Sequence, residues 1–202
     1  MTNKLLFFVL LALCFSGCDM LETHPYDVHI TGERELNNKN IQLIENKMQG
    51  KKTIRFAMIS DTQRWYNSTE DVVKALNARG DIDFVIHGGD QSDFGVTKEF
   101  IWMRDIFNKF QMPYVCLLGN HDCLGTGEDA YRAIYGDPNF AFTAGNVRFI
   151  CLNTNAMEYD YSEPVPDFNF IENELNNLSP EIEKNGIRNA RKTFLNLYST
   201  TM

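Results

Sequence analysis

A chain of 202 residues with 44% hydrophobic and 23% charged residues has a globular composition, which excludes a wholly disordered chain and predicts one domain, or one domain with a tail. The formal net charge is −8 at pH 7, and such a surface repels a phosphate backbone, so we expect no surface that binds nucleic acid regardless of sequence. Any site for a phosphorylated molecule therefore has to import positive charge, and a metal ion is one source.

The first residues have the features of a signal peptide. Lys4 precedes nine apolar residues, LLFFVLLAL, a stretch too short to cross the roughly 30 Å core of a bilayer, so we expect residues 1–17 to be a signal peptide. Residues 15–18, FSGC, resemble the lipobox of bacterial lipoproteins, with Phe15 where Leu is usual. The resemblance implies that Cys18 is lipidated and anchors the protein to a membrane of the bacterial cell envelope, facing the periplasm or the cell surface. The alternative is an ordinary secretory signal cleaved nearby.

Residues 18–52 are expected to form the lipidated cysteine and a polar tether. From Asp19 to Lys52 the chain is rich in Asn, Glu and Lys and has no sustained apolar period, a pattern typical of a segment that does not pack into a core. His24 and His29 lie in this segment, and we expect both to be solvated rather than to bind a metal.

The pattern beyond residue 52 alternates between strands and helices. The expected elements are, in chain order, a strand at 53–59, a helix whose capping signal is Ser68 with Asp71, a strand at 83–87, a helix that starts at Thr97, and a strand at 114–118. Strands joined by helices in this way favour a parallel sheet.

The later elements no longer alternate between parallel strands and helices. We expect a short helix at 129–135, and then FAFT and VRFICLN at 140–143 and 147–153 alternate like the two arms of an antiparallel hairpin. A final helix should begin at Asp167, carry apolar residues on one face and end at Ser179-Pro180. These elements place the domain at 53–178 and leave 179–202 as an atypical tail.

Three cysteines, Cys116, Cys123 and Cys151, lie beyond the signal region, so at least one of them has no partner within the mature chain. Cys116 and Cys151 stand inside apolar strand patterns. We expect these two to be small buried hydrophobic residues rather than a disulfide pair.

Each of the three parallel strands is followed by a polar turn. The turns read ISDTQ at 59–63, HGGDQSD at 87–93 and LGNHD at 118–122, at intervals of about 30 residues. One strand and helix unit has about that length, so the turns should emerge side by side at the carboxyl ends of neighbouring strands, where open α/β sheets build their sites.

The side chains of these turns suit divalent metal ions. The candidate set is Asp61, Gln63, Asp90, Asp93, Asn120, His121 and Asp122. Carboxylates brought together without cations would repel one another, whereas one or two divalent ions turn the same cluster into a binding site. His87 stands inside a strand, and we expect it to be a hydrogen-bonded core residue rather than a ligand.

Three blocks, DTQ at 61–63, GDQSD at 89–93 and GNHD at 119–122, resemble in order and spacing the first three signature blocks of the calcineurin-like metallophosphoesterases. The resemblance covers residues 53–178. It implies an α/β fold, the two-sheet αββα sandwich of that family. It also implies hydrolysis of phosphomonoesters or phosphodiesters, with two divalent ions and a metal-activated water. The substrate would be a small phosphorylated molecule.

The same resemblance implies roles for the metal ligands. Asp61 would ligate the first ion, Asp90 would bridge both ions, and Asn120 would ligate the second. Gln63 stands where the family has its first histidine ligand. A neutral amide oxygen there disfavours Zn²⁺ relative to Mn²⁺ or Mg²⁺. The resemblance implies two divalent ions from among Mn, Fe, Zn and Mg and does not identify which.

The remaining residues of the blocks would act on the substrate. By resemblance, His121 paired with Asp93 would stabilise the transition state and protonate the leaving oxygen. Asp122, beside it, would lie behind the ligands as a supporting residue.

The chain departs from the family pattern beyond His121. The family completes its site with three further histidines, and this sequence has no histidine after His121. We therefore expect weakened metal binding and a domain that is incomplete at its C-terminus. Two functions follow. One is a metal-dependent phosphoesterase with weak or absent activity, and the other is a non-catalytic envelope lipoprotein that keeps the scaffold for binding or structure.

Overall fold

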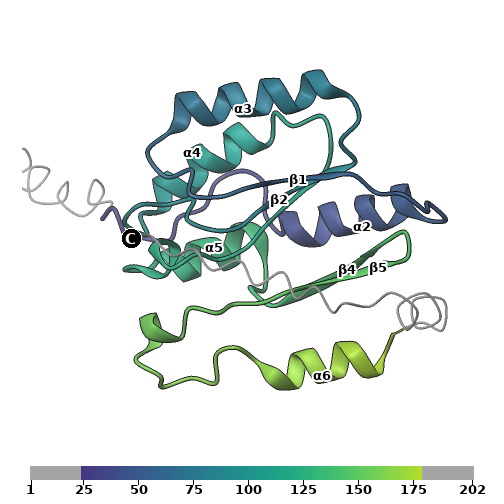
Figure 1. Ribbon diagram of the computed structural model, residues 1–202. Coiled ribbons are helices and arrows are strands. Elements are labelled where there is room, and N and C mark those ends of the chain that lie inside the picture. Colours follow the sequence, from purple (N-terminus) through teal and green to yellow (C-terminus); the bar gives the residue numbers. More distant parts are fainter. Residues whose placement is uncertain (1–23, 179–202) are drawn as a thin grey trace, which may run out of the picture.

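The computed structural model describes residues 24–178 (Figure 1). The expected signal peptide at 1–17, the lipidated Cys18 and the tail at 179–202 lie outside the described residues. Among the residues described, no helix combines the length and the apolar character needed to span a membrane.

A three-stranded parallel sheet forms the centre of the fold. Strands β1 (Phe56–Ile59), β2 (Phe84–His87) and β3 (Tyr114–Cys116) lie in that order, and both neighbouring pairs are parallel. The prediction of a parallel sheet built from strand and helix units is confirmed. Since parallel neighbours point the same way, the segments that follow all three strands leave the same edge of the sheet.

Three helices connect and follow these strands. They are α3 (Tyr66–Arg79), α4 (Thr97–Phe107) and α5 (Gly127–Tyr135), and α3 and α4 lie on the same side of the sheet (Figure 1). Helix α4 begins at the predicted residue. Helix α3 begins before Ser68, so the predicted capping role of Ser68 is wrong, and Trp65 occupies the N-cap position instead.

Side chains alternate across the sheet and feed two apolar cores. Val85 of β2 packs with the residues of α3 and α4, including Val73 and Phe100. Its neighbours Phe84 and Ile86 point to the opposite face and join a second core. This alternation is the period of two expected for strands buried on both faces.

The second core is shared with an antiparallel hairpin. Strands β4 (Phe140–Ala144) and β5 (Val147–Cys151) pair with each other, as predicted, and the rings of Phe84 and Phe142 meet edge to face at 5.7 Å between centroids. The 3₁₀ helix η2 (Ala156–Tyr159) and helix α6 (Phe168–Asn176) follow, and α6 lies beyond the hairpin (Figure 1). The side chain of Asp167 caps α6, as predicted, by accepting from the Phe170 N–H at 3.0 Å. An α/β fold with a parallel sheet and a second sheet is thus confirmed.

The predicted tether is wrong for part of its length, because helix α2 (Leu36–Met48) packs into the domain. Ile44 and Met48 are fully buried in the second core. The Asn37 side chain accepts from the Cys116 N–H at 2.9 Å and donates to the Cys116 carbonyl at 2.8 Å, which covers the outer edge of β3. Only a narrow apolar stripe of α2 faces the core, and the mostly polar composition of the segment therefore did not predict a packed helix. His24 and His29 are exposed, as expected.

The cysteine predictions hold. Cys116 and Cys151 are buried, and neither they nor Cys123 takes part in a disulfide within residues 24–178. Burial raises the pKa of the Cys116 and Cys151 thiols, so both side chains stay protonated and behave as core residues.

Candidate metal centre at the strand ends

Backbone hydrogen bonds bring the three predicted turns together. The Asp61 N–H donates to the Gly89 carbonyl at 3.1 Å, and the Gln63 N–H donates to the Asp90 carbonyl at 3.2 Å. These bonds join the turn after β1 to the turn after β2. The candidate residues therefore share the carboxyl edge of the sheet, as the spacing of the turns predicts.

Asp122 joins the turn after β2 to the turn after β3. It lies in the 3₁₀ helix η1 (His121–Cys123) and is fully buried. Four backbone N–H groups donate to its two carboxylate oxygens at 2.8 to 3.0 Å, from Asp90, Gln91, Ser92 and Gly119. Burial raises the pKa of Asp122 to about 7, while the N–H donors oppose that shift. The Asp122 side chain therefore fixes the backbone of the turn that carries the candidate ligand Asp90.

The approach of the two turns requires glycine. A Cβ added to Gly119 would lie 2.2 Å from the backbone nitrogen and from Oδ1 of Asp90. A Cβ added to Gly89 would lie 2.6 Å from the Gly119 nitrogen. Backbone and side chain are thus packed in direct contact around Asp90, which fixes the carboxylate in place.

Three residues of the site adopt a left-handed backbone that only glycine adopts without cost. Asp61, Arg64 and Asp90 have φ of 55°, 65° and 60°. Such conformations cost of the order of 1–3 kcal/mol each and cluster at functional sites. The strain lies at the strand ends that the sequence predicted to carry the ligands.

The carboxylates and amides of the site offer oxygen donors. Asp90 is fully buried, and its Oδ1 accepts from the His121 N–H at 3.0 Å. Gln63 Oε1 and Asn120 Oδ1 are buried, and neither finds a hydrogen-bond donor within residues 24–178. A buried oxygen without a donor loses the free energy of its hydration, and a cation restores it. The donor set of Asp61, Gln63, Asp90 and Asn120 therefore fits a hard divalent ion such as Mg²⁺ or Mn²⁺.

The site has few strong ligands. In the described part of the chain, no three side chains among His, Cys, Asp and Glu gather into a metal-binding group. Two of the four predicted ligands are neutral amides, so the oxygen donors there carry less charge than a set made of carboxylates.

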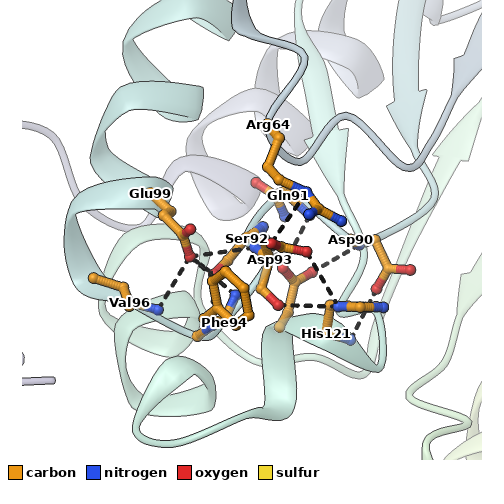
Figure 2. A network of polar contacts seen from close by, with 11 residues as sticks. Arg64, Asp90, Gln91, Ser92, Asp93, Phe94, Val96, Glu99 and His121 are labelled. Carbon is orange, nitrogen blue, oxygen red and sulfur yellow. Dashed lines mark hydrogen bonds and ion pairs between the residues drawn. The ribbon is translucent and has the colours of Figure 1, made fainter.

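His121 and Asp93 lie together as predicted, but the contact differs in detail. Nδ1 of His121 lies 3.0 Å from the backbone carbonyl of Asp93 and 3.7 Å from its carboxylate Oδ1 (Figure 2). A carbonyl oxygen only accepts, so Nδ1 carries the proton and Nε2 is left for another partner. The bond to the Asp93 carbonyl raises the pKa of His121, and the nearby carboxylates add to the shift.

Glu99, at the start of α4, holds the turn that carries Asp93. Its Oε2 accepts from the Ser92 hydroxyl at 2.6 Å and from the Asp93 and Phe94 N–H groups at 3.2 and 3.1 Å (Figure 2). One carboxylate thus satisfies several donors of a turn that has no ladder partner. Sequence reasoning missed this residue, although a Glu three residues after the N-cap position, here Val96, is a known capping signal.

His87 is a core residue, as expected. It is 1% exposed, its Nδ1 accepts from the Gly89 N–H at 3.2 Å, and its Nε2 lies 2.9 Å from the Thr62 hydroxyl. Because Nδ1 accepts, Nε2 donates and the ring is neutral. Burial lowers the pKa of His87 to about 3. The ring therefore links two turns of the site without ligating a metal.

A protein-family model matches the chain. The family model described as calcineurin-like phosphoesterase covers residues 54–196, which is more than half of the chain. It includes the three turns and continues past the end of α6. No curated protein matches the sequence.

Proposed function

Because the chain belongs to the calcineurin-like phosphoesterase family, whose model covers residues 54–196, we propose that it is a metal-dependent hydrolase of phosphomonoesters or phosphodiesters. The observation that carries the proposal is the meeting of three polar turns at one sheet edge. Backbone hydrogen bonds join the first turn to the second, and the buried Asp122 joins the second to the third. The substrate is proposed to be a small phosphorylated molecule.

The proposed metal ligands are Asp61, Gln63, Asp90 and Asn120. Support comes from the two buried amide oxygens, of Gln63 and Asn120, that have no donor among the described residues. Divalent ions held by these oxygens would supply activation of a water and neutralisation of charge on the phosphate. Two of these four ligands are neutral amides, which attract a divalent ion less than carboxylates do, so we expect activity to need added metal in excess.

The proposed general acid is His121. Its Nδ1 proton is committed to the Asp93 carbonyl, so the ring presents Nε2, and the raised pKa of His121 keeps more of the ring as imidazolium near neutral pH. An imidazolium can donate a hydrogen bond to a phosphate oxygen and pass a proton to the leaving oxygen. A positioned acid of this kind contributes about 10² to 10⁴ in rate.

Hydrolysis of an aryl phosphate monoester and diester with added Mn²⁺ tests the proposal. The wild-type protein should release the aryl alcohol, and His121→Ala should lower kcat by about 10² to 10⁴. His29→Ala is the matched control, since His29 is exposed and lies in the segment that precedes α2. Equal turnover by His121→Ala and His29→Ala would contradict the assigned role.

A second candidate function is a non-catalytic protein that retains the scaffold to bind a phosphorylated molecule. The observation that favours it is the neutral amide of Gln63, which stands where the family has its first histidine ligand. Phosphate binding without turnover in any divalent metal would support this function and contradict hydrolysis.

We also propose that Cys18 is lipidated and anchors the protein to a membrane of the bacterial cell envelope. The FSGC sequence before the mature chain supports this. Metabolic labelling with a radioactive fatty acid should label the wild-type protein and not Cys18→Ala. Label in both proteins, or in neither, would contradict the anchor.

For the fold, we propose that the parallel sheet and the hairpin belong to the two-sheet αββα sandwich of the family. The shared core of Phe84 and Phe142 supports it. A crystal structure in which the hairpin packs away from the parallel sheet would contradict it.

A further inference from the structure

Arg64 stands directly after the candidate ligand Gln63 and lies over the site. Its side chain is 69% exposed, and its Nε lies 3.1 Å from Oδ2 of Asp93 (Figure 2). The residue adopts a left-handed backbone with φ of 65°. This left-handed backbone carries a cost in strain, and strain of this kind is found at functional sites.

The partner of Arg64 is buried while Arg64 itself is not. The Asp93 side chain is 2% exposed, and its Oδ2 has no hydrogen-bond donor with suitable geometry in the described chain, although the Arg64 Nε is within ion-pair distance. Asp93 therefore attracts Arg64 by charge without fixing it through a directed bond. Within residues 24–178 the only ion pair of Arg64 is through Nε, so the terminal amino groups of the guanidinium can bind another acceptor.

The chemistry around Arg64 is that of an anion site in an acidic protein. The chain carries a net charge of −8, and Asp61, Asp90 and Asp93 add local negative charge that repels a phosphate. Arg64 and His121 are the two basic side chains in range of the Asp93 carboxylate within residues 24–178. A planar guanidinium is the group best suited to bind two phosphate oxygens at once.

We propose that Arg64 binds the phosphoryl group of the substrate, with Asp93 holding the guanidinium beside His121. The inference rests on the proposed function, since it assigns a recognition residue to the same site. The competing explanation is that Arg64 only neutralises the buried Asp93. The two explanations differ in what they predict for phosphate affinity.

Two measurements on Arg64→Ala, Arg64→Lys and a control variant separate these explanations. The first is isothermal titration calorimetry of inorganic phosphate into the full chain with Mg²⁺ present. The second is KM and kcat for an aryl phosphate monoester. The control is Arg55→Ala, because Arg55 forms an ion pair of the same length, 3.1 Å with Asp81, and is similarly exposed at 62%. Arg55 precedes β1 and so lies at the opposite end of the strand from the site.

Arg64→Ala should weaken phosphate binding about 10- to 100-fold, as expected for loss of hydrogen bonds between charged groups. KM of Arg64→Ala should rise by a similar factor, with a smaller change in kcat. Arg64→Lys should recover part of the phosphate affinity, because lysine keeps the positive charge but lacks the planar guanidinium that binds two oxygens at once. Arg55→Ala should change neither value by more than about twofold, since an exposed pair far from the site contributes little.

Each outcome decides one of the two claims. If the wild-type protein hydrolyses the ester and Arg64→Ala leaves phosphate affinity and KM unchanged, the inference fails while the proposed function stands. If phosphate binds through Arg64 but no ester is hydrolysed in any metal, the inference stands and the proposed hydrolysis fails. If the wild-type protein hydrolyses the ester but binds no inorganic phosphate, and Arg64→Ala leaves KM unchanged, the inference fails and the proposed function stands.

Discussion

Replacing Asp122 by Asn tests whether this carboxylate holds the site together. Its Oδ1 accepts from the Gln91 and Ser92 N–H groups at 2.9 and 2.8 Å, and its Oδ2 accepts from the Asp90 and Gly119 N–H groups at 2.9 and 3.0 Å. An amide has only one acceptor oxygen. Whichever way the Asn side chain turns, two buried N–H groups lose their acceptor and face an NH₂ group instead.

The cost follows from that count. A buried donor left without an acceptor costs about 1–3 kcal/mol, so Asp122→Asn should lower the free energy of unfolding by about 2–6 kcal/mol. Equilibrium urea denaturation, followed by circular dichroism, measures the loss. The matched control is Asp167→Asn at the start of α6, where the side chain accepts from one N–H, that of Phe170. Asn is as good an N-cap as Asp, so this control should lose less than about 0.5 kcal/mol.

A loss below about 1 kcal/mol for Asp122→Asn, equal to that of the control, would refute the reasoning. A loss in the expected range should be accompanied by faster hydrogen exchange at the amide of Gln91, which depends on Asp122. Faster exchange throughout the sheet, with no selective effect at this amide, would show that the variant perturbs the whole fold instead.

Three other changes test the surrounding structure. Gly119→Ala should abolish metal-dependent hydrolysis and destabilise the protein, because the new Cβ would lie 2.2 Å from the Asp90 nitrogen. The control Gly80→Ala has nothing within 4 Å of the added Cβ, so its stability should fall only by the cost of a positive φ at alanine. Equal losses of stability in the two variants would count against the close contact. Glu99→Ala should lower the free energy of unfolding by about 1–3 kcal/mol and speed hydrogen exchange of the Phe94 amide. Unchanged exchange at this amide would contradict the role of Glu99 in holding the turn that carries Asp93. Burial lowers the pKa of His87 to about 3, so the unfolded chain takes up a proton below about pH 6.5 that the folded chain does not. Relative to His87→Gln, the wild-type protein should therefore lose about 2 kcal/mol of stability between pH 7 and pH 5 and regain it as the pH rises, and a pH-independent difference would contradict this pKa.

The sequence allowed the strands and the positions of the turns to be predicted because those features are local. Short continuous apolar runs mark β1, β2 and β3, and polar residues follow each run at an interval of about 30 residues. The parallel arrangement then requires the turns to meet at one edge. Family resemblance added roles to residues that spacing alone could only group.

Other features depend on contacts between distant segments and could not be predicted in this way. Helix α2 was expected to be part of a tether because most of its residues are polar, yet Ile44 and Met48 pack against strands that follow much later in the chain. The four N–H bonds of Asp122 depend on two turns meeting in space. Nothing in the sequence distinguishes Arg64 from the other basic residues. Its left-handed backbone and its distance to Asp93 are visible only in the structure.

The most direct test of the proposed metal centre is the binding of Mn²⁺ to the wild-type protein and to Asp90→Asn, measured by isothermal titration calorimetry. Asp90 is fully buried between the three turns, and it is the proposed ligand of both ions. We expect saturable binding of Mn²⁺ by the wild-type protein and at least about tenfold weaker binding by Asp90→Asn. Equal binding by both proteins, or no binding by the wild-type protein, would contradict it.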